Sequence, residues 1–188
     1  MEGPVQPVAW VISKPRGKEM RQARRMFAAV SLAPAGVLRL NVPHLTLEIL
    51  YPPLPDLANL TAAIAETARD GTPCRVPALG VVRELSGSVS VELALTPELV
   101  ALRRALADAL SRIGASLHSG STETWRPHLS VVGKEELGNK VWAQAEPDSA
   151  VADYQFSVES LTLSLPTRVP GRFREFGAYR LGKVTYGR

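Results

Sequence analysis

Two short segments of nearly the same sequence, 84 positions apart, constrain the fold of this chain more than any other feature. The first reads PHLTL and spans Pro43–Leu47, and the second reads PHLSV and spans Pro127–Val131. Apolar and polar residues alternate in both, which is typical of a β-strand with one buried face. We therefore predict two half-buried strands, one in each half of the chain, each presenting a histidine and a hydroxyl residue on its polar face.

The rest of the sequence alternates between strand-like and helix-like segments. Helices are predicted over Lys18–Val30, between Asp56 and Gly71, from Thr96 to Gly114, and over the short segment Asn139–Ala145. Strands are predicted over Val5–Ile12, Val42–Tyr51, Arg75–Arg83, Ser88–Leu95, Pro127–Gly133, Gln155–Leu165 and Phe173–Leu181. This order predicts an α+β fold of two antiparallel sheets or half-sheets related by approximate symmetry, with outer helices and a central cleft.

The sequence also allows predictions for two individual segments, a strand and a loop. Pro77 and Gly80 interrupt the strand Arg75–Arg83, which favours a place at the edge of a sheet because proline cannot donate a ladder hydrogen bond. The polar, Gly- and Ser-rich stretch Ala115–Thr124 is expected to be a loop.

The composition fits one bilobal domain over residues 1–188, since 45% of the residues are hydrophobic. A single cysteine, Cys74, excludes an internal disulfide and favours a reducing cytoplasm. Three scattered histidines give no metal-ligand spacing, so neither a metal nor a cofactor is expected. The apolar run Val8–Ile12 is too short for a signal peptide or a membrane span. The formal charge of +4 is compatible with a nucleotide or nucleic-acid ligand.

The paired motifs suggest phosphate chemistry. His44 and Thr46 share one strand face, as do His128 and Ser130, about 6–7 Å apart along each strand. If the two strands face each other across a cleft, two hydroxyls can donate hydrogen bonds to a phosphate. One imidazole can then accept a proton while the other donates one. The third histidine, His118, lies in a polar segment and does not fit the pattern.

The tetrapeptides HLTL (His44–Leu47) and HLSV (His128–Val131) resemble the signature of the 2H phosphoesterase superfamily, which includes the bacterial 2′-5′ RNA ligase group. The resemblance implies a bilobal fold and hydrolysis of a cyclic phosphodiester, such as an RNA 2′,3′-cyclic end or a small cyclic nucleotide, or ligation in reverse. It implies that His44 and His128 are the catalytic acid and base, and that Thr46 and Ser130 bind the phosphate. A monomer that does not bind membranes is expected.

Other interpretations stay open. The very basic segment from Lys14 to Arg25 departs from the family pattern, so the substrate is not fixed. A non-catalytic nucleotide- or RNA-binding module, a small-molecule phosphoesterase and a purely structural domain are the alternatives. Glu48 is predicted on the His44 face and solvated. Arg168, Arg172 and Arg174 form a basic loop that can contact an RNA backbone.

Overall fold

In the computed structural model, residues 8–30, 42–83, 89–118, 125–132, 146–167 and 173–182 are described. Three helices lie in this part of the chain, namely α1 (Gly17–Val30), α2 (Leu57–Asp70) and α3 (Pro97–Arg112). The strands are β1 (Ala9–Ser13), β2 (Leu45–Tyr51), β3 (Cys74–Arg83), β4 (Val89–Leu93), β5 (Ser116–Leu117), β6 (His128–Val132), β7 (Gln155–Val158), β8 (Ser160–Pro166) and β9 (Phe173–Arg180). The helix predicted over 139–145 lies outside the described residues.

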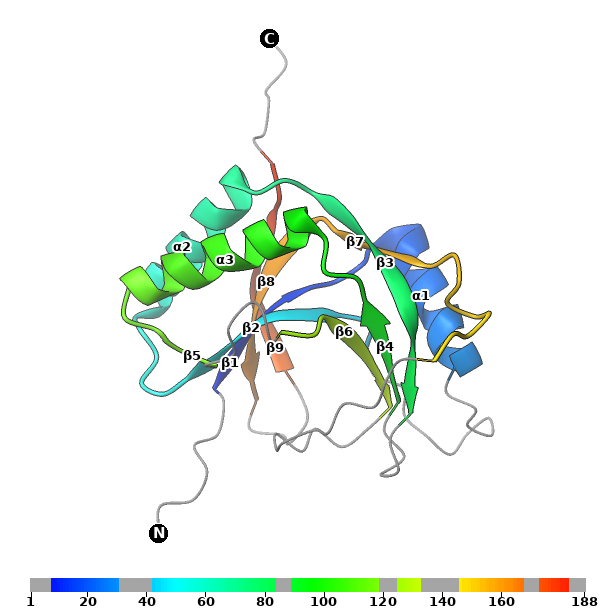
Figure 1. Cartoon of the computed structure of the whole chain (residues 1–188). Coiled ribbons are helices and arrows are strands. Elements are labelled where there is room, and N and C mark those ends of the chain that lie inside the picture. The colour runs from blue at the N-terminus through cyan, green and yellow to red at the C-terminus, as the bar shows by residue number, and fades with distance from the viewer. Residues whose placement is uncertain are drawn as a thin grey trace.

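The strands form a sheet with the order β7-β3-β4-β6-β2-β1-β8-β9, in which β5 also pairs with β2 (Figure 1). All its paired strands are antiparallel. Four strands lie on each side of the junction between β6 and β2. The chain repeats a strand-helix-strand order, β1-α1-β2 and β4-α3-β6, and each helix contacts the half to which its flanking strands do not belong, since α1 contacts β7 while α3 contacts β2 and β5. The predicted α+β fold with two related half-sheets is therefore confirmed.

The sheet is curled, and a very short connection shows why. β7 lies at one end of the strand order and β8 lies next to the other end, yet only Glu159 separates them in sequence. One residue spans less than about 4 Å, so the sheet must bend until its two ends come close together. The predicted single strand over Gln155–Leu165 is thus two strands that belong to different halves.

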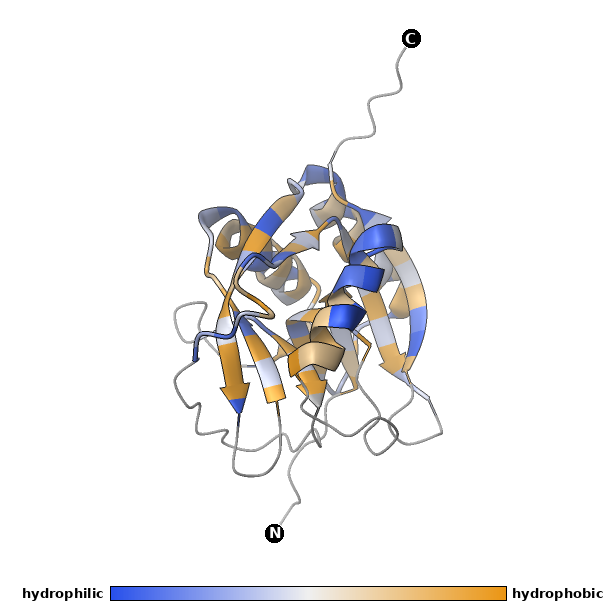
Figure 2. Cartoon of the chain, turned by 90° about the vertical axis from the view of Figure 1, so that its right-hand side faces the viewer, coloured by the Kyte–Doolittle hydropathy of each residue, from blue (hydrophilic) through white to orange (hydrophobic). Residues whose placement is uncertain are grey.

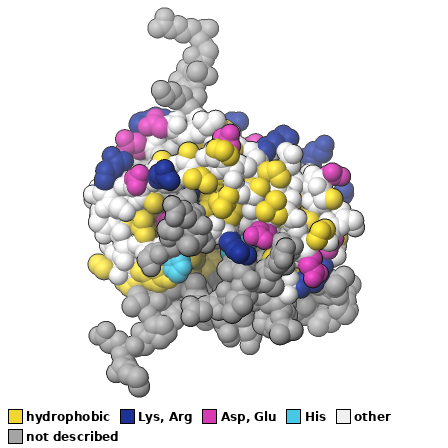
Figure 3. All heavy atoms as spheres, in the orientation of Figure 1, with side chains coloured by type: hydrophobic (Ala, Val, Ile, Leu, Met, Phe, Trp, Pro, Cys, Tyr) yellow, Lys and Arg dark blue, Asp and Glu magenta, His cyan; other side chains and the backbone are white. Residues whose placement is uncertain are grey.

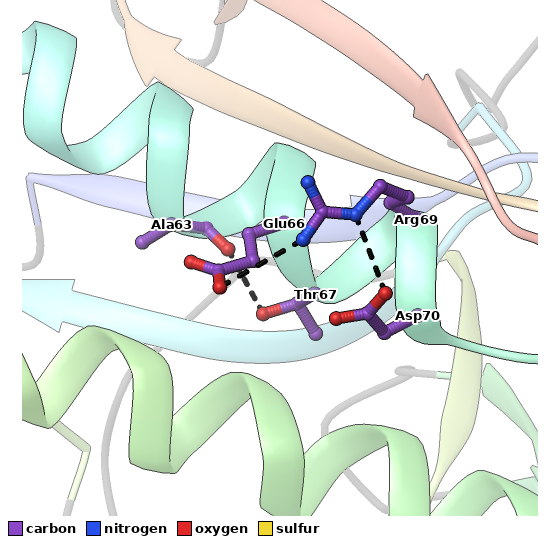
Figure 4. Close-up of polar contacts among 5 residues, drawn as sticks. All are labelled: Ala63, Glu66, Thr67, Arg69 and Asp70. Atoms are coloured by element: carbon purple, nitrogen blue, oxygen red, sulfur yellow. Dashed lines mark hydrogen bonds and ion pairs between the residues drawn. The ribbon is translucent and has the colours of Figure 1, made fainter. Parts of the chain in front are cut away.

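The helices begin where the sequence indicates. The Asp56 carboxylate accepts a hydrogen bond from the Ala58 amide at 2.9 Å, and the Thr96 hydroxyl accepts one from the Leu99 amide at 3.3 Å. Farther along α2, the buried Thr67 hydroxyl donates to the Ala63 carbonyl, and exposed Arg69 pairs with neighbouring carboxylates (Figure 4). None of the described helices is long and apolar enough to cross a membrane.

Two local predictions were wrong. β3 is not an edge strand, because Cys74–Pro77 pair with β7 and Ala78–Arg83 pair with β4. Pro77 is tolerated because it stands where β3 changes from one neighbour to the other. The predicted loop over 115–124 contains the two-residue strand β5, which is too short to give an alternating pattern.

Candidate active site

The two histidine motifs lie side by side at the centre of the sheet. Leu45 of β2 is directly opposite Leu129 of β6 in an antiparallel pair. Both leucines are fully buried, so they mark the core face of the two strands. The two motif strands are hydrogen-bonded neighbours in one sheet. They are therefore closer together than two strands that face each other across a cleft, which is the arrangement considered from the sequence.

This register fixes which polar groups meet. One residue away from the leucine pair, His44 lies opposite Ser130 and Thr46 lies opposite His128. All four side chains are half-buried and share the face opposite the core. Directly opposite residues have Cβ atoms about 4.5–5.5 Å apart, and diagonal ones about 7–8 Å apart. The two imidazoles are the diagonal pair, so their Cβ atoms are about 7–8 Å apart.

Both imidazoles are held in the same way. The Nδ1 atom of His44 lies 2.7 Å from the Val42 carbonyl oxygen, and that of His128 lies 2.9 Å from the Arg126 carbonyl oxygen. Each carbonyl belongs to the residue before a proline, which restricts that residue to extended backbone. Because a carbonyl only accepts, Nδ1 donates its proton, and in the neutral ring the proton-accepting nitrogen is Nε2.

Strand β4 adds two polar residues to the same face. Ser90 is opposite Ser130, and Glu92 is opposite His128. Ser90 is buried, and the Glu92 carboxylate lies 3.9 Å from the exposed Arg126 guanidinium. The alternating sequence of β4 already places Ser90 and Glu92 on one polar face, and that alternation is the only signal that links them to the site.

Glu48 does not lie where the sequence predicts. In the pairing of β1 with β2, Thr46 is opposite Ile12 and Glu48 is opposite the next residue, Val11, so β2 has one extra residue at this β-bulge. Beyond the bulge, the alternation of core-facing and outward-facing side chains along β2 shifts by one residue. Glu48 is 3% exposed and lies 3.5 Å from the Arg103 guanidinium of α3, which is 5% exposed. The prediction of a solvated Glu48 was therefore wrong. Burial raises the pKa of Glu48 while Arg103 lowers it, and burial lowers the pKa of Arg103.

Arg103 also connects the two motifs. Its Nε donates to the Leu47 carbonyl at 3.1 Å, in the last residue of the first motif. Its guanidinium carbon lies 4.6 Å from the centre of the Trp125 ring, three residues before His128. The signal that sequence reasoning missed is a single arginine within the buried leucine stripe of α3, between Leu99 and Leu106.

The other candidate residues lie away from the pair or carry no catalytic feature. His118 is exposed and bonds to Tyr51, which is seven residues from His44 along β2, or about 23 Å. Arg174 lies on β9 and stacks on Phe176, while Arg168 and Arg172 fall outside the described residues. Burial raises the pKa of Cys74 to about 11, so its thiol is a poor nucleophile near neutrality.

The described residues contain no group of three or more His, Cys, Asp or Glu side chains placed to hold a metal ion. The two motifs supply two imidazoles and two hydroxyls on one face, and Ser90 and Glu92 of β4 lie beside them. Such a set can hold a phosphate and move protons at two of its oxygens.

Comparisons with known proteins identify the family and agree with the fold. The family model described as the 2′-5′ RNA ligase superfamily matches residues 13–168. Among solved structures, E. coli LigT in apo form is 18% identical, with a TM-score of 0.62 over 94% of this chain and 99% of that chain. TT0787 of Thermus thermophilus is 15% identical, with a TM-score of 0.64 over 93% of this chain and 97% of that chain. No curated protein sequence matches.

Proposed function

The chain belongs to the 2′-5′ RNA ligase superfamily, a group of 2H phosphoesterases, and from that premise we propose that it hydrolyses a cyclic phosphodiester without a metal ion. The substrate class is a 2′,3′-cyclic phosphate at an RNA end or on a nucleotide, and attack by a sugar hydroxyl in place of water gives 2′-5′ ligation. The observation that supports the proposal most is the Leu45–Leu129 register, which gathers both His-x-Thr/Ser pairs on one face.

The four motif residues have distinct roles in this proposal. Thr46 and Ser130 donate hydrogen bonds to the non-bridging phosphate oxygens, since hydroxyls rotate to suit an acceptor. His44 and His128 approach the phosphorus from its two sides, which in-line displacement requires. The carbonyl contact at each Nδ1 orients the ring, so that Nε2 is the atom that exchanges protons with the substrate.

The reaction is balanced by the two imidazoles alone. A water oxygen forms a bond to phosphorus, and its proton passes to the neutral imidazole. The bond between phosphorus and one sugar oxygen breaks, and the protonated imidazole gives its proton to that oxygen. The ring opens to a phosphomonoester, and solvent returns the histidines to their starting protonation states. In ligation, a sugar hydroxyl takes the place of the attacking water along the same path.

The structural neighbours add support for nucleotide substrates. E. coli LigT has been crystallised with phosphate, with 3′-AMP, with ATP and with NADP+. These ligands all carry a phosphate group, and those other than inorganic phosphate also carry a nucleoside. A site of this kind in the present chain accepts either a mononucleotide or the end of an RNA.

The direct test uses purified protein, EDTA and two substrates, 2′,3′-cyclic AMP and an RNA oligomer with a 2′,3′-cyclic phosphate. We expect turnover that EDTA does not reduce, with one product isomer that identifies which ring bond breaks. The rate should follow a bell-shaped pH profile near neutrality, because one imidazole must be neutral and the other protonated. Tight binding of both substrates without turnover favours the alternative of a nucleotide-binding module and contradicts the proposal.

The hydroxyls allow a second prediction. Replacing Thr46 or Ser130 by alanine removes one hydrogen bond to a charged phosphate, which is worth about 1.5–3 kcal/mol. We expect kcat/KM for 2′,3′-cyclic AMP to fall by about 10- to 100-fold in each variant. Thr61→Ala on α2 is the control, because the Thr61 hydroxyl only donates to backbone carbonyls of its own helix. Equal kinetics for Thr46→Ala and Thr61→Ala contradict a phosphate-binding role.

A further inference from the structure

The first helix exposes a stripe of positive charge on the side that faces away from the core. Ala23, Met26, Phe27 and Val30 are buried on its inner side. The exposed side carries Lys18, Arg21, Arg24 and Arg25, and the hydrophilic bands of α1 face the viewer in Figure 2. Among the residues that the structure describes, none of these four cations forms an ion pair.

This stripe accounts for the basic character of the whole chain. Residues 14–25 hold six of the 22 basic residues and one of the 18 acidic ones, so this segment carries +5 and the rest of the chain −1. The one acid, Glu19, points inward and accepts a hydrogen bond from the Ser157 hydroxyl at 2.7 Å. On the face that Figure 3 shows, by contrast, basic and acidic side chains are interspersed.

The stripe works against the stability of its own helix. Arg21 is followed by arginines three and four positions later, Arg24 and Arg25, and like charges at these spacings repel on a helix surface. An ordinary solvated helix places glutamates at such positions, and α1 does not. The arrangement indicates that a negatively charged partner covers this face.

The surroundings of the stripe narrow the class of partner. A membrane-surface helix needs an exposed apolar side, and the apolar side of α1 is buried in the core. A protein interface is centred on aromatic and large apolar residues, and the exposed side of α1 has none. Arginine forks fit phosphate oxygens, so charge complementarity favours a chain of phosphates.

The stripe starts close to the candidate active site. Ser13, the last residue of β1, pairs with Leu45, which is the neighbour of His44. Gly17, where α1 begins, is four residues farther along the chain. The first turn of α1 contacts β7 through Glu19 and Ser157, and the helix then runs for 14 residues, or about 21 Å, away from β7 to Val30, whose carbonyl accepts a hydrogen bond from Arg83 of β3. The basic track therefore begins near the strand end that carries His44, on the core side of the sheet. A polymer whose end lies at His44 reaches this track by passing the end of β1 at Ser13, and the track is several nucleotides long.

We propose that the exposed face of α1, defined by Lys18, Arg21, Arg24 and Arg25, is a docking surface for the backbone of an RNA whose terminal cyclic phosphate lies at the His44/His128 pair. The inference rests on the proposed function and identifies a polynucleotide as the substrate that the protein binds more tightly than a mononucleotide. A mononucleotide reaches the same catalytic groups without contacting α1. In this proposal α1 binds the RNA backbone, while His44 and His128 act on the terminal phosphate.

The test compares two triple variants of equal net charge. The α1 variant carries Arg21→Gln, Arg24→Gln and Arg25→Gln, and the matched control carries Arg75→Gln, Arg104→Gln and Arg112→Gln, which are exposed on β3 and α3. Glutamine keeps helix propensity close to that of arginine. Binding of a short single-stranded RNA is followed by fluorescence anisotropy at several salt concentrations, and turnover of 2′,3′-cyclic AMP is measured in parallel.

We expect the α1 variant to lose RNA affinity by at least about 10-fold, and the slope of log Kd against log salt to fall by about 2, while the control keeps the affinity of the natural chain. Turnover of the mononucleotide should stay within about twofold in both variants. Equal loss in both variants, or no loss in either, overturns the docking surface. RNA binding that depends on α1 in a protein without turnover overturns the proposed function alone. Binding of α1 to anionic vesicles or acidic peptides in preference to RNA also overturns the inference.

Discussion

Replacing either His44 or His128 by alanine is expected to lower kcat for a 2′,3′-cyclic nucleotide by about 10²- to 10⁴-fold, the usual contribution of general acid–base catalysis. Each imidazole is oriented by a carbonyl contact at Nδ1 and stands beside a hydroxyl of the opposite strand. Neither can replace the other, because the base and the acid must act on opposite sides of the phosphorus. Steady-state kinetics with 2′,3′-cyclic AMP measure the effect.

The controls distinguish chemistry from folding. His118→Ala removes the remaining histidine, which is exposed, and should keep full activity. Both motif variants should keep the thermal stability of the natural chain to within a few degrees, since the two side chains are only half-buried. The double variant should be little slower than either single one, because residues that act as a unit are not additive. Full turnover by either single variant would falsify the catalytic assignment.

The second large effect concerns stability. Arg103→Met is expected to lower the free energy of unfolding by about 3–5 kcal/mol, because it leaves the buried Glu48 carboxylate without its cation. The loss should grow with pH. Burial raises the pKa of Glu48 and Arg103 opposes that rise, so without Arg103 the folded state holds the Glu48 proton more tightly than the unfolded state does. Stability must then fall as the pH rises from the ordinary range of a carboxyl group to the raised pKa.

Chemical denaturation of Arg103→Met at about pH 5 and about pH 8, with the natural chain alongside, measures both expectations. The matched control is the double variant Glu48→Gln and Arg103→Met, which removes both charges and keeps an acceptor for the Ile49 amide. Replacing both partners of a buried pair is often close to neutral, so most of the stability should return. A double variant as unstable as Arg103→Met would show that the loss comes from the Leu47 and Trp125 contacts instead.

Much of the fold followed from local patterns. Apolar spacing and capping residues located the three described helices to within a residue or two, because Asp56 and Thr96 satisfy the first amides of α2 and α3 in the structure as well. Alternation located the two motif strands, because leucines on one side and polar residues on the other leave few ways to place a strand. The 2H phosphoesterase resemblance rested on the same two motifs, and the family match confirmed it.

The features that could not be predicted from the sequence depend on contacts between distant segments. The pairing of Leu45 with Leu129 is a choice of register that no local pattern encodes. The bulge that turns Glu48 toward α3 interrupts alternation by one residue, and a sequence pattern carries no mark of it. Arg103 was hidden in a leucine stripe because a buried cation is stabilised only by a partner from another element.

The antiparallel crossing of the two motifs has a consequence for how a substrate is read. Because His44 faces Ser130 and Thr46 faces His128, a rotation by half a turn exchanges the two histidines with each other and the two hydroxyl residues with each other. A phosphate bound in either orientation therefore meets the same kinds of group. The motifs alone therefore do not set the polarity of a bound strand. That polarity must come from whatever differs between the two halves. Helix α1 carries a run of uncompensated cations, while α3, at the corresponding place in the other half, mixes Glu98 and Asp108 with its arginines.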